Sequence, residues 1–366
     1  MPKQTVLLSP RKYIQGRGVL QLLPTEASRL GSKPALLWDT GVESIVGEQV
    51  LTYFREAGCE PTSITFHGEA SRGEAERIGQ ALREQGADCL IGLGGGKTMD
   101  VTKAAAHYAE AATVTVPTIA SNDSPCSSFT VWYTDEGKAD GYDTWGQCPD
   151  LVLVDTQVIV AAPIRTFISG LGDALATWFE ADAAFRSRSG NLVGGQPTAA
   201  ALALAKLCCE TVLEYGESAL EAVRQKVVTH AVEKVVESTV LHSGVGFESG
   251  GLATAHQIAN YMPVFEECHG IMHGEEVAFG LLTQMCLDED ADPTLVNDVV
   301  DFMIRVGLPV TFKELGLENV SRERLYLMGN ICEAEGSFCH NHSFEVTADD
   351  VVDAMIAANQ LGESRA

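Results

Sequence analysis

The sequence predicts a two-part α/β protein, with a parallel sheet covered by helices over residues 1–162 and an all-helical part over residues 163–366. In the first part, short apolar runs alternate with amphipathic segments, which is typical of parallel strands connected by helices. After about residue 163, apolar residues recur at helical spacing and strand signals become few. We set the boundary at Pro163, within VAAPIRTF, because proline interrupts regular structure.

Six apolar runs in the first part are expected to form the strands. They span residues 5–9, 34–39, 62–68, 88–94, 113–118 and 151–155. Amphipathic helices are expected between them, for example at 48–57 and 72–85. In the second part, helical spacing is clear in AALALAKLCCETVLEYG and in EEVAFGLLTQMCL. Parallel sheets bind ligands at the carboxyl ends of their strands, so function should concentrate there.

A glycine run connects the expected strand at 88–94 to a helix that begins with KTMDVTKA. The run is one residue out of step with the triphosphate-binding P-loop, and it lacks the third glycine of the dinucleotide fingerprint. Glycines nevertheless allow close backbone approach, and a helix N-terminus offers N–H groups and partial positive charge to an anion. We therefore expect a phosphate-binding turn at residues 94–96 rather than a turn without a ligand.

Asp39 ends the expected strand at 34–39. An acidic residue in this position commonly hydrogen-bonds the adenosine ribose of a dinucleotide and repels a 2′-phosphate. An aspartate in a turn is also ordinary, so the residue alone leaves its role open. If Asp39 contacts the ribose, the cofactor is NAD rather than NADP.

The composition excludes several classes of function. Lys and Arg total 25 and Asp and Glu total 50, which gives a formal net charge of −25. This charge repels nucleic acid and anionic lipid. No stretch approaches the roughly 18 apolar residues of a membrane helix, and the N-terminal residues lack the apolar core of a signal peptide. Because the ten cysteines show no regular spacing, we expect reduced thiols in a cytoplasmic protein.

Three residues of the helical part have side chains suited to a divalent metal ion. Asp173 lies in an otherwise apolar helix, His256 follows a pair of glycines, and His273 comes just before a helix. One carboxylate and two imidazoles would give zinc three ligands and leave a position open for substrate. The spacing matches no local metal motif, so the pattern alone leaves the metal undecided. The histidines of SFCHNHSFE are expected to lie in a solvated tail.

Five segments, taken in order, resemble the iron-type (group III) alcohol dehydrogenase family and, within it, the glycerol dehydrogenase branch, which uses zinc. They are GLGGGKTMDVTKA, VPTIASNDSPCS, GLGDALATWFEA, GVGFESGGLATAH and HGEEVAFGLLTQ. The resemblance runs from about residue 5 to about residue 335. It implies a dinucleotide-binding α/β domain, a helical domain, and an active site in the cleft between them.

The same resemblance implies roles for individual residues. The implied metal ligands are Asp173, His256 and His273, and Thr177 stands where iron-using relatives carry a further histidine. Asp123 is implied to bind the substrate beside the nicotinamide. The implied NAD contacts are Asp39, Gly96, Lys97, Thr118, Ser121, Ser127, Phe129 and Tyr133.

The activity implied is oxidation of glycerol to dihydroxyacetone at a zinc site, with hydride passing from C2 to NAD. Asn122 and QIANYMPVFEECHGIM depart from the family pattern, so a dehydrogenase of another 1,2-diol or a 2-hydroxy acid, with NAD or NADP, is the alternative. A lyase of the dehydroquinate synthase type would need a cluster of lysine and arginine that the helical part lacks. An NAD-binding module without catalysis is a third alternative. The family also implies a homo-oligomer, up to an octamer.

Overall fold

The computed structural model describes residues 4–135 and 137–365, which form two compact units. The sheet unit comprises residues 8–163 and 222–244. The helical unit comprises residues 4–7, 164–221 and 245–365. The units therefore depart from a single cut after residue 162, because the chain returns to the sheet unit over residues 222–244.

A six-stranded parallel sheet, in the order β1-β8-β5-β4-β2-β3, forms the centre of the sheet unit. Its strands are β1 (Tyr13–Gly16), β2 (Pro34–Trp38), β3 (Thr62–Thr65), β4 (Cys89–Gly94), β5 (Ala112–Pro117) and β8 (Leu151–Asp155). All strands except β1 overlap the expected ones, and the predicted parallel sheet is confirmed. Every residue of β2, β4 and β8 is buried, as expected for strands covered on both faces.

The strand expected at residues 5–9 is wrong. Thr5 makes only an isolated parallel bridge, to Gln196, and no regular strand forms around it in the described chain. Pro10, which has no backbone N–H group to donate, follows directly. The first strand is instead Tyr13–Gly16, which pairs in parallel with β8. Its four residues, YIQG, contain too little apolar periodicity to be recognised from the sequence.

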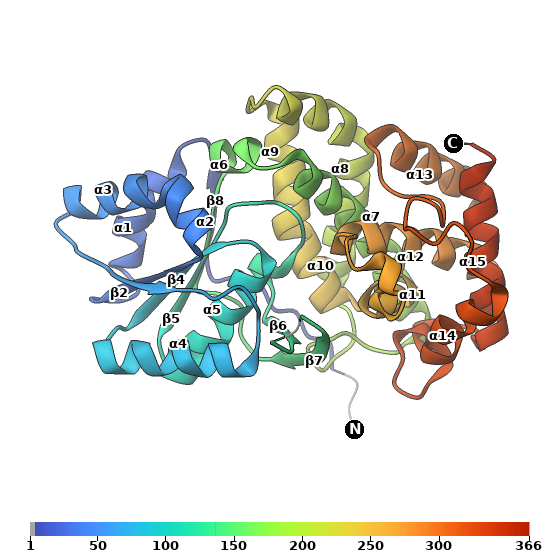
Figure 1. Ribbon diagram of the computed structural model, residues 1–366, viewed down its shortest axis with the longest axis horizontal. Coiled ribbons are helices and arrows are strands. Elements are labelled where there is room, and N and C mark those ends of the chain that lie inside the picture. The colour runs from blue at the N-terminus through green and yellow to red at the C-terminus, as the bar shows by residue number, and fades with distance from the viewer. Residues whose placement is uncertain (1–3, 136, 366) are drawn as a thin grey trace. The chain divides into compact units, whose positions relative to one another are not determined.

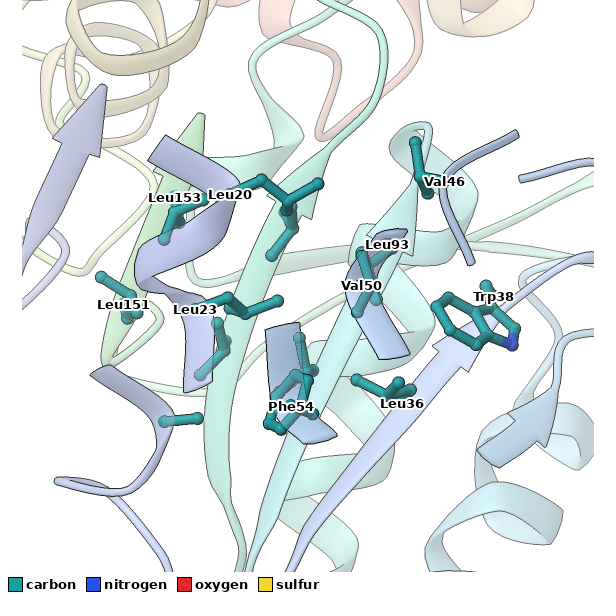
Figure 2. Close-up of a cluster of buried hydrophobic side chains, with 14 of the residues drawn as sticks. Leu20, Leu23, Leu36, Trp38, Val46, Val50, Phe54, Leu93, Leu151 and Leu153 are labelled. Atoms are coloured by element: carbon teal, nitrogen blue, oxygen red, sulfur yellow. The ribbon is translucent and has the colours of Figure 1, made fainter. Parts of the chain in front are cut away.

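Helices cover both faces of the sheet (Figure 1). One face carries η1 (Val19–Leu22), α1 (Leu23–Ala27) and α3 (Glu48–Glu56), and the other carries α4 (Arg72–Gln85) and α5 (Gly96–Ala109). Successive strand residues point to opposite faces. Leu36 and Trp38 of β2 therefore pack in one cluster with Phe54 of α3, shown in Figure 2. Ala35 and Leu37 pack in the other cluster, with residues of α4 and α5. The helices expected at 48–57 and 72–85 are confirmed.

The other elements of the sheet unit are short. They are α2 (Thr40–Val42), the π-helical turn η2 (Glu43–Gly47), η3 (Ser124–Cys126), the antiparallel hairpin of β6 (Phe129–Tyr133) and β7 (Ala139–Thr144), α6 (Thr156–Ala161), α9 (His230–Glu237) and the π-helical turn η4 (Ser238–His242). The sequence did not predict the hairpin. Residues 222–244, here called the returning segment, contact the sheet through Glu233. Gln15 of β1 and Thr156 of α6 each donate a hydrogen bond of 2.8 Å to the Glu233 carboxylate.

Helices are the only regular elements of the helical unit among the described residues, as predicted. They are α7 (Ile164–Ser187), α8 (Ala199–Arg224), α10 (Ser243–Gly250), α11 (Thr254–Tyr261), η5 (Met262–Val264), η6 (Glu266–Cys268), α12 (His273–Leu287), α13 (Pro293–Val306), α14 (Arg322–Glu333), η7 (Phe338–Asn341) and α15 (Ala348–Glu363). Within the part of the chain that is described, none of the helices combines the length and the apolar character needed to cross a membrane.

Candidate active site

Three residues expected to bind metal meet in the helical unit. Asp173 comes from α7, His256 from α11, and His273 is the first residue of α12. One ligand atom from each lies within 4.8 Å of the others. Asp173 Oδ1 is 3.2 Å from His256 Nε2 and 3.6 Å from His273 Nε2. Asp173 and His256 are buried, whereas His273 stays partly accessible, so an ion held here could be reached by a substrate.

The spacing and chemistry of these three side chains fit a zinc ion. Zinc binds nitrogen and oxygen ligands at about 2.1 Å, so the ligand atoms of a tetrahedral site lie about 3.4 Å apart. The two distances from Asp173 Oδ1, 3.2 and 3.6 Å, lie on either side of this value. Imidazole and carboxylate ligands are also accepted by iron. Three protein ligands leave a coordination position for a substrate oxygen.

Two glycines beside the ligand residues bring α7 and α12 together. Gly172 precedes Asp173, and a Cβ atom on it would lie 3.0 Å from the carbonyl carbon of Gly274 and closer to its oxygen. Gly274 follows His273, and its Cβ would lie 2.6 Å from the carbonyl carbon of Ser169. Carbon atoms in contact are about 3.5 Å or more apart. Glycine at both positions therefore lets the helices approach closely enough for the two ligand side chains to meet.

Glu180 of α7, which the sequence did not single out, holds His256. Its carboxyl group is fully buried, with Oε2 paired to His256 Nδ1 and Oε1 accepting the backbone N–H groups of Ala253 and His256, both at 2.9 Å. The Phe247 ring stacks on the imidazole, with 6.5 Å between ring centroids. Burial alone lowers the pKa of His256, but the charges and hydrogen bonds of Glu180 and Asp173 raise it well above its usual value. The one available signal was helical spacing, which puts Glu180 on the same face of α7 as Asp173.

Neither Thr177 nor His269, the histidine four residues before His273, belongs to the converging ligand group. Thr177 is buried on α7 against Gly246, where a Cβ atom would lie 2.6 Å from Thr177 Cγ2. A histidine at position 177 would therefore have to displace neighbouring backbone. His269 is exposed, and its Nε2 atom lies 3.1 Å from the Pro263 carbonyl oxygen.

The expectation that both histidines of SFCHNHSFE lie in a solvated tail is right for His340, which is exposed, and wrong for His342. Cys339 and His342 are buried, and His342 Nε2 lies 2.8 Å from the Thr254 hydroxyl oxygen at the start of α11. Asn341 donates a hydrogen bond of 2.8 Å to the Leu252 carbonyl oxygen. His342 and Asn341 therefore bond to groups around the turn that precedes α11, whereas His340, Ser343 and Glu345 are exposed.

In the sheet unit, the glycine run forms the turn from β4 into α5. Gly95 is the residue before the helix, Gly96 is its first residue, and both are partly exposed. A Cβ atom on Gly94 would lie 2.7 Å from Thr98 Cβ, so glycine here also lets α5 pack directly against β4. The run thus has a packing role as well as leaving the helix N-terminus open to an anion.

Lys97 is already paired in this structure. Its ammonium group lies 2.7 and 2.8 Å from the two carboxylate oxygens of Glu69 and 4.9 Å from the centroid of the Tyr133 ring. Glu69 was not identified from the sequence. A phosphate at the start of α5 would share the Lys97 charge with this carboxylate.

The remaining residues expected to bind NAD follow the carboxyl ends of parallel strands. Asp39 follows β2, where its Oδ1 atom accepts the Val42 N–H at 2.8 Å and so caps α2. Thr118 follows β5 and donates its backbone N–H to the Gly94 carbonyl oxygen at 2.9 Å. Asp39, the glycine turn and Thr118 thus lie on one edge of the sheet. The segment after Thr118 carries the others, namely Ser121, Ser127, Phe129 and Tyr133, of which only Tyr133 is not buried.

Asp123 lies in the same segment, directly before η3, and is buried. Its Oδ2 atom accepts a hydrogen bond of 2.9 Å from the Ser243 hydroxyl group, which arrives on the returning segment. Nearby, buried Lys103 pairs with Asp100 at 2.9 Å and donates to the Ser124 carbonyl oxygen at 2.9 Å. These contacts hold the Asp123 side chain and the backbone carbonyl of the next residue, Ser124. Asp100 and Lys103 belong to the glycine motif, but sequence reasoning gave no role to them or to Ser243.

Comparison with known proteins identifies relatives along the whole chain. Residues 10–156 match the iron-containing alcohol dehydrogenase family. A glycolaldehyde reductase from Halobacterium salinarum is 42% identical, and a glycerol dehydrogenase from Citrobacter freundii is 40% identical, each over 98% of both chains. Among solved structures, glycerol dehydrogenase from Schizosaccharomyces pombe is 37% identical with a TM-score of 0.93, covering 99% of this chain and 92% of that one.

Proposed function

The chain belongs to the iron-containing alcohol dehydrogenase family, and on that premise we propose that it oxidises glycerol to dihydroxyacetone with NAD at a zinc site. The observation that carries the proposal is the convergence of Asp173, His256 and His273 at distances suited to zinc. The relatives named glycerol dehydrogenase support the substrate.

Each proposed residue has a separate task. Asp173, His256 and His273 would hold the ion, and Asp123 would accept a hydrogen bond from a substrate hydroxyl group. Ser243 orients that carboxylate through its own hydrogen bond. Bound zinc would lower the pKa of the reacting hydroxyl group; the hydroxyl proton would pass to water, and the hydride from C2 would pass to the nicotinamide.

The proposed NAD site lies along the carboxyl edge of the sheet. The N-terminus of α5 and Lys97 would attract the diphosphate, because both present positive charge at the glycine turn. Asp39 would accept hydrogen bonds from the adenosine ribose and repel the 2′-phosphate of NADP. Residues 118–133 would line the cofactor further along.

Reduction of glycolaldehyde is a second candidate, favoured by the similarity to the Halobacterium salinarum reductase. Glycerol and glycolaldehyde both carry oxygen atoms on adjacent carbons, so the same open metal position suits either. Another 1,2-diol or a 2-hydroxy acid remains the broader alternative. These candidate functions differ in the substrate, whereas the residues proposed to bind metal, cofactor and substrate are the same in each.

A substrate screen of the zinc-loaded protein tests the proposal. NADH absorbance would be followed with glycerol, other 1,2-diols and 2-hydroxy acids, and with glycolaldehyde in the reducing direction. We expect the highest kcat/KM for glycerol with NAD. A higher value for glycolaldehyde would favour the second candidate, and no turnover of any alcohol or aldehyde would refute the assignment of a dehydrogenase.

We further propose that the chain acts in the cytoplasm as a homo-oligomer, with the sheet unit serving NAD and the helical unit holding the metal. The ten cysteines are all free, which supports a reducing compartment. The family resemblance supports assembly. Light scattering of the purified protein measures the mass in solution, and a monomer would contradict the proposed assembly.

A further inference from the structure

The carboxyl group of Glu180 is buried and forms hydrogen bonds with one segment, the start of α11. It is fully buried on α7, and its two oxygens take three contacts from the chain that begins α11. Oε1 accepts the backbone N–H groups of Ala253 and His256, and Oε2 pairs with His256 Nδ1. The same carboxyl group therefore holds the backbone and the ring of one candidate metal ligand.

This arrangement fixes which ring nitrogen faces the metal position. A carboxylate accepts hydrogen bonds and does not donate them, so the proton of the pair with Glu180 lies on His256 Nδ1. When the ring is neutral, as a metal requires, the other nitrogen, Nε2, then carries the lone pair that binds the metal. Nε2 is also the atom that lies 3.2 Å from Asp173 Oδ1. The tautomer set by Glu180 and the direction of the metal position therefore agree.

We propose that Glu180 is a positioning residue of the metal site, which selects the His256 tautomer with a free Nε2 and seats the first turn of α11. The inference rests on the proposed function, because it assumes that Asp173, His256 and His273 bind an ion. Glu180 is not part of the converging ligand group, and both of its oxygens contact the chain that begins α11. Phe247 supports the same placement by stacking on the ring, but it cannot select a tautomer.

Glu180→Gln tests the idea because it preserves size and removes one acceptor. If the amide oxygen keeps the two backbone N–H groups, the amide NH2 group faces His256 Nδ1 and donates to it. The ring must then carry its proton on Nε2, where it blocks the metal. If the amide turns around, the NH2 group faces two backbone donors instead. Glu180→Asp keeps the carboxylate but withdraws it by about one bond length, 1.5 Å.

Glu276→Gln is the matched control. Glu276 is also a buried glutamate of the helical unit, three residues after His273 on α12. Its side chain forms no hydrogen bond with the residues that the structure describes. This exchange therefore makes the same Glu-to-Gln substitution close to the site without altering a partner of His256, on a carboxyl group whose pKa burial raises to about 8.

The experiment measures metal affinity directly. Metal is removed with a chelator, and each protein is titrated with Zn²⁺ and, for its visible absorption bands, with Co²⁺. We expect E276Q to bind like the wild type and E180Q to bind about 10- to 100-fold more weakly with altered Co²⁺ bands. E180D should fall between them. Far-UV circular dichroism and thermal unfolding of the metal-free proteins show whether each variant is folded.

Each outcome decides one claim. Wild-type affinity and unchanged Co²⁺ bands in E180Q would overturn the role of Glu180 while leaving the proposed function in place. A wild-type protein that binds no Zn²⁺ would overturn the proposed function itself. If E180Q does not fold, E180D is compared with Glu276→Asp. Weaker Zn²⁺ binding in E180D alone supports the proposal, and equal binding in both contradicts it.

Discussion

Gly274→Ala should break the proposed metal site by separating two helices. The added Cβ atom would lie 2.6 Å from the Ser169 carbonyl carbon and nearer still to its oxygen. Carbon atoms need about 3.5 Å, so α12 must move away from α7 by about 1 Å. Metal–ligand distances tolerate only about 0.2 Å. His273 and Asp173 would therefore no longer reach the same ion.

The expected cost in stability is about 1–3 kcal/mol, the usual penalty for forcing an extra carbon into a packed interior. Zinc content and thermal unfolding of the metal-free and zinc-loaded protein measure the two effects. Gly270→Ala is the matched control, because a Cβ atom there meets nothing within 4 Å. The reasoning is refuted if Gly274→Ala keeps a full zinc complement and the unfolding temperature of Gly270→Ala.

Three further predictions concern the cofactor, the ligand set and a buried acid. Asp39→Gly should raise kcat/KM with NADP relative to NAD, because it removes the charge that repels the 2′-phosphate; an unchanged ratio would place Asp39 away from the ribose. His273→Ala should lose zinc and turnover but keep NADH binding, whereas His269→Ala should keep its zinc. Metal analysis that finds zinc in His273→Ala and none in His269→Ala would show that His269 is the ligand instead. Burial and the nearby charge of Glu275 raise the pKa of Glu276 from 4.5 to about 8, so between these values the folded chain holds a proton that the unfolded chain has lost. The contribution of Glu276 to the free energy of unfolding is therefore complete below pH 4.5 and is lost as the pH rises to about 8, by about 1.4 kcal/mol per pH unit. Urea unfolding of Glu276→Gln should show a flatter pH dependence than that of the wild type.

The sequence by itself determined the elements whose signals lie close together along the chain. Helix α4 was predicted with its observed bounds, Arg72–Gln85. Ser71 caps its first turn by accepting the Glu74 N–H, and Gly86 ends it with a φ of 62°. The buried strands β4 and β8 were recognisable because continuous apolar runs are typical of parallel strands covered on both faces. Tyr13–Gly16 escaped notice because its place in the sheet depends on β8, far along the chain.

The family resemblance indicated Asp173, His256 and His273, but only the tertiary structure showed their atoms to lie within 4.8 Å. It also decided what surrounds them. Gly172 and Gly274 are informative only once α7 lies against α12, and Glu180 acquires a role only once α11 begins beside it. Periodicity reports which face of a helix is buried, not which distant helix packs there. Close backbone approach and hydrogen bonds between distant segments depend on that packing, so no local sequence pattern predicts them.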